Sequence, residues 1–396
     1  MNLRNYTIVT ASYWGFTLTD GALRMLVLLH FHALGYSPVS LAFLFLLYEF
    51  CGVLTNLLGG WVGSRVGLKF TLYTGLALQI GALLMLSFLD PAWGATLSVA
   101  YVMASQALSG IAKDLTKMSS KSAVKLLVPD NEGALFKWVS ILTGSKNALK
   151  GVGFLLGGLL LTWFGFTSAL WLMAGGLGVV LLSALLLLNQ DMGKTKSKVK
   201  FTQLFSKSRE INWLSAARML LFASRDVWFV VALPVFLKES FGWSFNQVGG
   251  FMAAWVIGYG IIQASAPKLA RRGQPRRSAS IWVAGLSIIT LSLALLMHMG
   301  IFPIPSLMIG LTVFGIIFAV NSAVHSYLIL AFTDDDQVAL NVGFYYMANA
   351  CGRLLGTLLS GVVFLVGGLS ACLWTSAGML VLATLLTWPL RSDKFS

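Results

Sequence analysis

Long apolar stretches dominate this 396-residue chain and limit its possible folds more than any other feature. About twelve of them reach the roughly 20 residues that a helix needs to cross a bilayer. Only helices and closed barrels satisfy their backbone groups inside a membrane, and barrel strands alternate apolar with polar residues. Runs such as FLLGGLLLTWFGF at 154–166 are instead almost continuously apolar. We therefore predict an all-α membrane protein.

The composition fits this class, because 57% of the residues are hydrophobic and only 11% are charged. Soluble domains carry about 25% charged residues. No small-residue cleavage site follows Arg4, so the first span is expected to remain in the protein. We predict twelve transmembrane helices in two six-helix halves, with spans at 6–33, 38–62, 70–89, 94–120, 135–162, 168–189, 211–237, 246–266, 279–300, 306–331, 341–366 and 369–390.

Basic residues gather in the loops on one predicted side, whereas the opposite loops hold little charge beyond Asp90, Lys238 and Glu239. Positively charged loops face the cytosol. We therefore expect a multi-pass protein of an inner or plasma membrane with both termini in the cytosol. The same rule accounts for the net charge of +14 without nucleic acid. The basic residues are Arg65, Lys69, Lys121, Lys125, those of KTKSKVK (194–200), Lys207, Arg209, Lys268, Arg271, Arg272, Arg276 and Arg277.

A hydrophilic stretch rich in Lys and Ser separates the first six spans from the last six. It predicts an N-terminal half at 1–190, a cytoplasmic linker at 191–210 and a C-terminal half at 211–396. The halves repeat one another in parallel, as LGYS (34–37) and FGWS (241–244) illustrate.

Charged residues recur at related points of this repeat. Lys150 in the fifth span corresponds to Arg353 in the eleventh, and Asp20 in the first corresponds to Asp226 in the seventh. A charge at the centre of a membrane helix costs about 2.5 to 3.5 kcal/mol on insertion scales, so each should face a partner or a cavity. The third, sixth, ninth and twelfth spans have no Asp, Glu, Lys or Arg in their interiors.

The embedded charges contain more cations than acids, so even complete pairing leaves positive groups over. The candidate substrate-binding cations are Lys146, Lys150, Arg353, Lys113, Lys117, Arg225, Arg24 and Arg218. The acids are Asp20, Glu49, Asp114 and Asp226, which are also the candidate proton carriers.

Spacing along single helices separates structural pairs from functional groups. Asp20 and Arg24 lie four residues apart, which predicts a pair within one helix. Lys146 and Lys150 have the same spacing and repel one another, so we expect them to bind an anion or to pair with Asp114 or Glu49 of neighbouring helices. Lys113 and Lys117 continue as a stripe with Lys121 and Lys125, and we expect these last two to lie at the cytoplasmic end or to snorkel towards it.

Converging Lys and Arg side chains in a partly desolvated cavity suit a ligand with several phosphate-like or carboxylate oxygens. No phosphate-binding loop for ATP, no metal-ligand spacing, no cofactor motif and no activated nucleophile is evident. Secondary transport driven by an ion gradient or by exchange is therefore the predicted activity, ahead of a membrane-embedded enzyme or a receptor.

GGWVGSRVGLK (59–69) resembles the cytoplasmic motif of the major facilitator superfamily, although Ser64 stands where that motif has Asp. The resemblance implies a substrate site between the two halves, with every third helix facing lipid. Gly144, Gly153 and Gly157 also resemble the glycine-rich motif of proton-coupled exporters in this superfamily, but the same spacing suits close helix packing.

Three stretches resemble the ArsJ family of organoarsenical efflux permeases: YWGFTLTDGALRMLVLLHFHALGYSP (13–38), SGIAKDLTKMSSKSAVKLL (109–127) and LTGSKNALKGVGFLLGG (142–158). The resemblance implies a bacterial inner-membrane protein, expected to be a monomer, that exports 1-arseno-3-phosphoglycerate and so gives arsenate resistance. A functional link to glyceraldehyde-3-phosphate dehydrogenase also follows from it, while the glycine-rich motif favours proton antiport.

The residues agree with such a cargo, because hard oxyanions need Lys and Arg. Trivalent arsenic would need clustered thiols, and the three cysteines are isolated. A phosphorylated metabolite such as phosphoglycerate or a sugar phosphate, moved in exchange for phosphate, is the alternative.

Overall fold

The computed structural model describes residues 3–36, 43–127, 132–188, 208–243, 245–270, 275–334 and 337–391, which are helical apart from short connections. The predicted linker at 191–210 lies almost entirely outside this part. The N-terminal half contains α1 (Leu3–Ala33), α3 (Leu46–Val66), α4 (Leu68–Ser87), α5 (Ala95–Leu127) and α6 (Glu132–Leu187). The C-terminal half contains α7 (Arg209–Phe229), α8 (Ala232–Phe241), α9 (Phe245–Leu269), α10 (Pro275–His298), α11 (Pro303–Ala331), α12 (Val338–Thr387) and the 3₁₀ turn η3 (Trp388–Arg391).

Two of these helices are too long to cross a bilayer once. The 56 residues of α6 would extend far beyond the roughly 30 Å hydrocarbon core at about 1.5 Å per residue. The chain turns at Gly165 (φ 75°) in α6 and at Gly367 and Gly368 (φ 64°) in α12. Positive φ is accessible to glycine without strain, so these residues allow each helix to double back as two spans.

The helices of the described chain account for the twelve predicted spans. Eight segments are long and apolar enough to cross a membrane on composition alone, and α6 and α12 are among them. Since these two each contain two spans, α1 and α3, whose sequences are interrupted by embedded charges, complete the set. The predicted all-α, twelve-helix fold is therefore confirmed.

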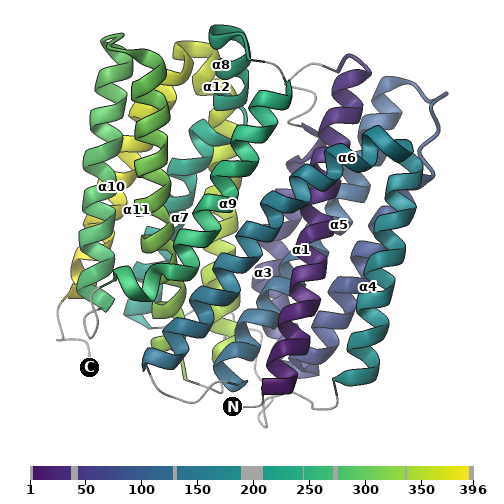
Figure 1. Cartoon of the computed structure of the whole chain (residues 1–396). Coiled ribbons are helices and arrows are strands. Elements are labelled where there is room, and N and C mark those ends of the chain that lie inside the picture. The colour runs from purple at the N-terminus through teal and green to yellow at the C-terminus, as the bar shows by residue number, and fades with distance from the viewer. Residues whose placement is uncertain are drawn as a thin grey trace.

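Figure 1 shows two groups of helices side by side, with both chain termini at the same end of the bundle. We call this end the terminal face and the other end the opposite face. Between the groups, α6 packs against α9, and α3 packs against α12. The helices α3, α6 and α12, which carry Glu49, Lys146, Lys150 and Arg353, thus lie where the two halves meet.

The halves pack closely against each other at the terminal face. One hydrophobic core there combines Tyr6 and Leu127 of the N-terminal half with Leu330 and Val338 of the C-terminal half. Towards the opposite face, each half instead has a core of its own. Apolar packing between the halves thus closes the bundle at the terminal face.

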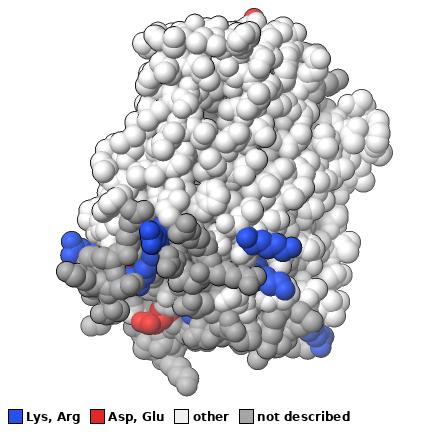
Figure 2. All heavy atoms as spheres, turned by 60° about the vertical axis from the view of Figure 1, so that its left-hand side comes forward, with Lys and Arg blue, Asp and Glu red and all other residues white. Residues whose placement is uncertain are grey.

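Charge-free spans form much of the outer surface. The second part of α6 exposes Trp171, Val179 and Leu186, and α10 exposes Ile288 and Leu295. Figure 2 shows a wide surface without charge, with the Lys and Arg side chains gathered towards the terminal face. This distribution suits a belt of lipid contacts above a basic, water-facing end.

The closure at the terminal face requires glycine on α6 and α9. A Cβ atom on Gly144 would lie 2.4 Å from the backbone nitrogen of Ala264, and one on Gly260 would lie 2.5 Å from the carbonyl oxygen of Gly144. The small residues therefore allow close helix packing between the halves.

We expect Gly144→Ala to lower the stability of this closed form by about 1 to 3 kcal/mol, the usual cost of overpacking. The melting temperature of the detergent-purified protein measures the effect. Gly176→Ala is the matched control, because a Cβ there meets no atom within 4 Å. Equal melting temperatures for the two variants would contradict the close approach.

Candidate functional site

Four buried carboxylates lie among Lys and Arg side chains between the two halves, on α1, α3, α5, α6, α7 and α12. The acid side chains are only 1% to 6% exposed, whereas their cationic partners are 12% to 23% exposed. An incoming solute therefore meets the cations first. The carboxylates lie behind them and hold them in place.

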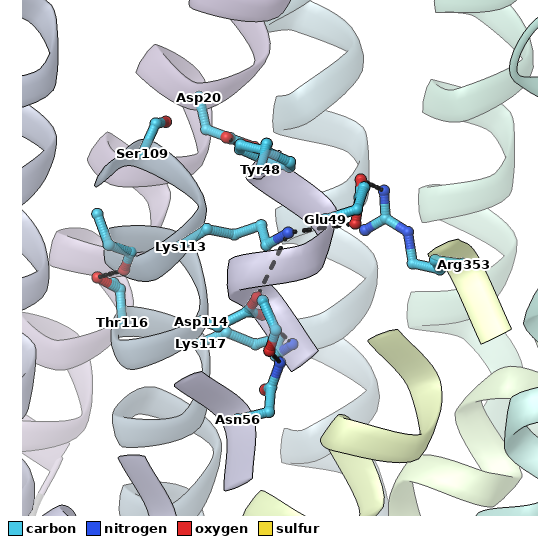
Figure 3. Close-up of polar contacts among 12 residues, drawn as sticks. Asp20, Tyr48, Glu49, Asn56, Ser109, Lys113, Asp114, Thr116, Lys117 and Arg353 are labelled. Atoms are coloured by element: carbon cyan, nitrogen blue, oxygen red, sulfur yellow. Dashed lines mark hydrogen bonds and ion pairs between the residues drawn. The ribbon is translucent and has the colours of Figure 1, made fainter. Parts of the chain in front are cut away.

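Glu49 of α3 is the centre of this arrangement. Its carboxylate lies 3.2 Å from Arg24 of α1, 3.5 Å from Lys113 of α5 and 2.5 Å from Arg353 of α12. Figure 3 shows Lys113 and Arg353 extending towards Glu49 from different helices. Three cations from both halves thus converge on one carboxylate.

The remaining acids extend the network. Asp114 binds Lys113 at 3.4 Å and also binds Lys117 one turn away on α5. On the C-terminal side, Asp226 lies 3.3 Å from Arg353 and 2.5 Å from Arg225. A single chain of contacts therefore runs from the N-terminal half to the C-terminal half through Glu49 and Arg353.

The internal repeat of the sequence appears in space as two related ion pairs. In the N-terminal half, Lys150 binds Asp20 at 2.9 Å, while the related residues Arg353 and Asp226 pair in the C-terminal half. Tyr48 supports the first pair by donating a hydrogen bond of 2.5 Å to Asp20. Each half thus presents one acid-bound cation towards the other.

Two expectations from the sequence were wrong. Asp20 does not bind Arg24 on its own helix; it binds Lys150, and Arg24 binds Glu49. Lys121 is not a surface residue either, because it is only 5% exposed and donates a hydrogen bond of 2.5 Å to the hydroxyl of Tyr346 in the other half.

The reason for the first error is the geometry between helices. Spacing of i,i+4 brings two side chains near each other on one helix, but charged groups on packed neighbours lie as close and are fixed by the packing. Arg24 therefore pairs with Glu49 of α3, and Asp20 pairs with Lys150 of α6, rather than with each other.

A second layer, closer to the terminal face, contains cations without carboxylates. Within the described residues, Lys146, Lys121 and Arg218 make no ion pair. Arg218 donates to the carbonyl and hydroxyl oxygens of Ser322 at 3.1 and 3.0 Å and lies over the ring of Phe222. We call Lys121, Lys146 and Arg218 the unpaired cation layer.

Lys146 is the most unusual member of this layer, because no hydrogen bond or ion pair to it is found in the described part of the chain. The charged groups with the largest electrostatic effect on it are Lys150, Lys121, Lys117 and Arg353, all of them bases. Such a position is costly unless another negative group arrives.

Sequence reasoning also missed several neutral groups of the site. Tyr48 and Tyr346 bind Asp20 and Lys121, and their rings lie 3.9 Å from the Lys113 ammonium and 4.6 Å from the Lys117 ammonium. Neither tyrosine carries a charge, and both lie in apolar spans. The one signal in the sequence was that Tyr48 directly precedes Glu49.

Metal binding has no support in the described residues, which contain no group of three or more His, Cys, Asp or Glu side chains suited to an ion. The three cysteines are free.

Comparisons with known proteins agree on one architecture. The family model described as Major Facilitator Superfamily matches residues 7–302 and 214–395. Among curated protein sequences, no significant match is found.

Solved structures of similar fold include three transporters at low sequence identity. The human organic anion transporter MFSD10 has a TM-score of 0.78 at 18% identity, covering 97% of this chain and 99% of that one. A bacterial homologue of the iron transporter ferroportin, in an outward-facing state, has a TM-score of 0.80 at 14% identity, covering 98% and 100%. The proton:xylose symporter XylE has a TM-score of 0.79 at 14% identity, covering 98% and 96%.

Proposed function

This chain belongs to the major facilitator superfamily and is a secondary transporter embedded in a membrane, and we propose that its substrate is a small organic molecule with several oxyanion groups. The proposed cargo is 1-arseno-3-phosphoglycerate, exported from the cytosol of a bacterium to give arsenate resistance. The solved structures of similar fold do not indicate which substrate this chain carries. The substrate proposal therefore depends on the side chains between the halves.

The observation that carries this proposal is the unpaired cation layer. The largest electrostatic effects on Lys146 come from bases, and none of Lys146, Lys121 and Arg218 has a carboxylate partner within the described residues. Uncompensated charge at membrane depth is retained where function needs it. An anionic substrate supplies the missing negative charge.

The types of cation also suit oxygen-rich anions. Lys presents a compact charge with three donors, while the planar fork of Arg suits phosphate, arsenate or carboxylate oxygens. Lys146 of the unpaired layer and Arg353 of the network interact electrostatically with one another. We propose that two anionic groups of one substrate contact these two layers.

The charge distribution supports the membrane orientation that we propose. Exposed Arg65, Lys137, Lys268 and Arg277 lie at helix ends of the terminal face. By the positive-inside rule we place this face, with both termini, in the cytosol. The closed face would then be the cytosolic one, and in an exporter this is the form that releases cargo outside.

For the energy source we propose proton antiport, with Asp20, Glu49, Asp114 and Asp226 as candidate carriers. Each of these acids binds at least one cation that could also bind substrate. Exchange for inorganic phosphate, with a phosphorylated metabolite as cargo, is the second candidate. It is favoured by the same layers of Lys and Arg, which do not distinguish arsenate from phosphate esters.

Uptake into everted membrane vesicles tests the cargo. Arsenate supplied together with glyceraldehyde-3-phosphate dehydrogenase and its triose substrate should accumulate far more than arsenate alone. Vesicles without the transporter are the control. Equal accumulation from the two mixtures would reject the arsenate conjugate.

The same vesicles test the energy source. With a protonophore present, proton antiport predicts that accumulation falls to the level of the control vesicles. Phosphate exchange predicts unchanged uptake that depends on phosphate loaded inside the vesicles. Uptake that survives the protonophore would therefore remove antiport.

A further inference from the structure

Glu49 occupies the position of a bound anion. Its side chain is 3% exposed and is contacted by Arg24, Lys113 and Arg353, which are between 12% and 23% exposed. Its Oε2 atom makes no hydrogen bond within the described structure and has Lys113 at 3.5 Å. The carboxylate thus lies where three accessible cations meet, with acceptor capacity left over.

Glu49 also connects the two halves. Among the described residues, the 2.5 Å contact between Glu49 and Arg353 is the one ion pair that joins an N-terminal helix to a C-terminal helix. All other described pairs lie within one half. The related position in the C-terminal half has no equivalent, because α9 contains no Asp or Glu. Glu49 is therefore an addition to the repeated plan, placed at the interface.

Arg353 can change partners without becoming isolated. Its Nε lies 3.3 Å from Asp226 within its own half, while its Nη2 binds Glu49 across the interface. Glu49 likewise retains Arg24 and Lys113 if Arg353 moves away. Breaking the contact between the halves thus leaves no buried charge without a partner, and this keeps the cost of separation low.

We propose that Glu49 is a tethered anion, which the substrate displaces from Arg353, so that substrate binding itself releases the ion pair between the halves. This inference rests on the proposed function, because it assumes an anionic substrate. The substrate oxyanion takes the guanidinium that Glu49 held, and the halves become free to move apart at this level.

Glu49 and the substrate compete for the same cations, and this competition determines whether a proton on Glu49 favours or opposes substrate binding. Arg24, Lys113 and Arg353 face the carboxylate from α1, α5 and α12, and Tyr48 precedes it on α3. A proton on Glu49 removes the competitor for these cations, so proton and anion binding favour one another, and linkage requires the effect to be mutual. Antiport needs the two ligands to exclude one another. Glu49 therefore does not fit the role of the antiport carrier.

Binding of 3-phosphoglycerate to the purified full-length protein in nanodiscs tests the proposal. Glu49→Gln removes the competitor, so the affinity should rise about 5- to 20-fold, within the range of typical coupling energies. Asp114→Asn is the charge-matched control, because Asp114 binds Lys113 and Lys117 but does not contact Arg353. If added positive charge alone mattered, both variants would bind more tightly by the same factor.

The distance between the halves provides a second readout. Spin labels at Leu34→Cys and Met299→Cys, both on exposed residues near the opposite face, report it in a protein whose native cysteines are replaced. We expect Glu49→Gln without ligand to show the distance distribution that the parent protein shows with 3-phosphoglycerate, and Asp114→Asn to keep the ligand-free distribution.

The outcomes distinguish a failure of the tethered anion from a failure of the proposed function. Equal tightening in both variants, or an unchanged distance in Glu49→Gln, would overturn the tethered anion while leaving an anion transporter. If the parent protein binds neither 3-phosphoglycerate nor arsenate, the proposed function fails and the tethered anion fails with it.

Discussion

Replacing Lys146 by methionine should abolish export while the protein stays folded in the membrane. Lys146 has no acid partner in the described part of the chain, so its removal leaves no carboxylate uncompensated and relieves repulsion from Lys150, Lys121 and Lys117. A hydrogen bond to a charged group contributes about 1.5 to 3 kcal/mol, which corresponds to a roughly 10- to 150-fold weaker affinity for the anion. Stability should be equal or higher.

Arsenate resistance of cells, anion binding in nanodiscs and melting temperature measure these effects together. Lys137→Met on the same helix is the matched control, because Lys137 is exposed at the terminal face. Lys146→Arg keeps the charge and should retain most of the binding. Full resistance in cells with Lys146→Met would show that the unpaired layer does not hold the substrate.

Much of the architecture could be predicted because membranes restrict the options. Apolar length predicted the spans and their order, and the charge-free spans in the second part of α6 and in α10 carry exposed apolar side chains. The cost of burying charge predicted that Glu49, Asp226 and Arg353 would gather between the halves, as they do. Asp20 and Lys150 were singled out by the repeat, and they form a pair.

The pairing within the site could not be predicted from sequence. Which cation meets which acid depends on the rotation and depth of neighbouring helices, and spacing along one helix does not contain this information. Lys121 illustrates the difficulty, because its place near the end of α5 suggested a snorkelling side chain. In the structure Lys121 is buried and donates a hydrogen bond to Tyr346 of the other half. The closure at the terminal face likewise depends on contacts between halves that the sequence does not display.

The structure divides the embedded charges into two kinds. In the network around Glu49, each cation has a carboxylate that offsets its burial, and a substrate must compete for it. In the unpaired layer, Lys121 and Arg218 bind the neutral groups of Tyr346 and Ser322, and Lys146 has no partner among the described residues, so a substrate meets no carboxylate competitor there. An oxyanion at the unpaired layer therefore displaces no carboxylate, whereas an oxyanion at Arg353 must displace Glu49.

Replacing Lys150 by methionine should have the largest effect on stability. Asp20 is 6% exposed and would lose its cation, keeping only the hydrogen bond from Tyr48. Removing one partner of a buried ion pair costs about 3 to 5 kcal/mol, because an uncompensated charge remains. The melting temperature of the purified variant should fall by several degrees, and expression in the membrane should fall with it. Lys150→Arg keeps the charge and is the control.

The double variant Asp20→Asn with Lys150→Met separates packing from function. With both charges removed, the penalty disappears and the melting temperature should return close to that of the parent protein, as for a buried pair replaced on both sides. Transport should remain lost, because Lys150 also stands beside Lys146 and would contact the anion. Recovery of transport together with stability would mean that Lys150 serves only to neutralise Asp20, and the anion site would then consist of Arg353 and the unpaired layer alone.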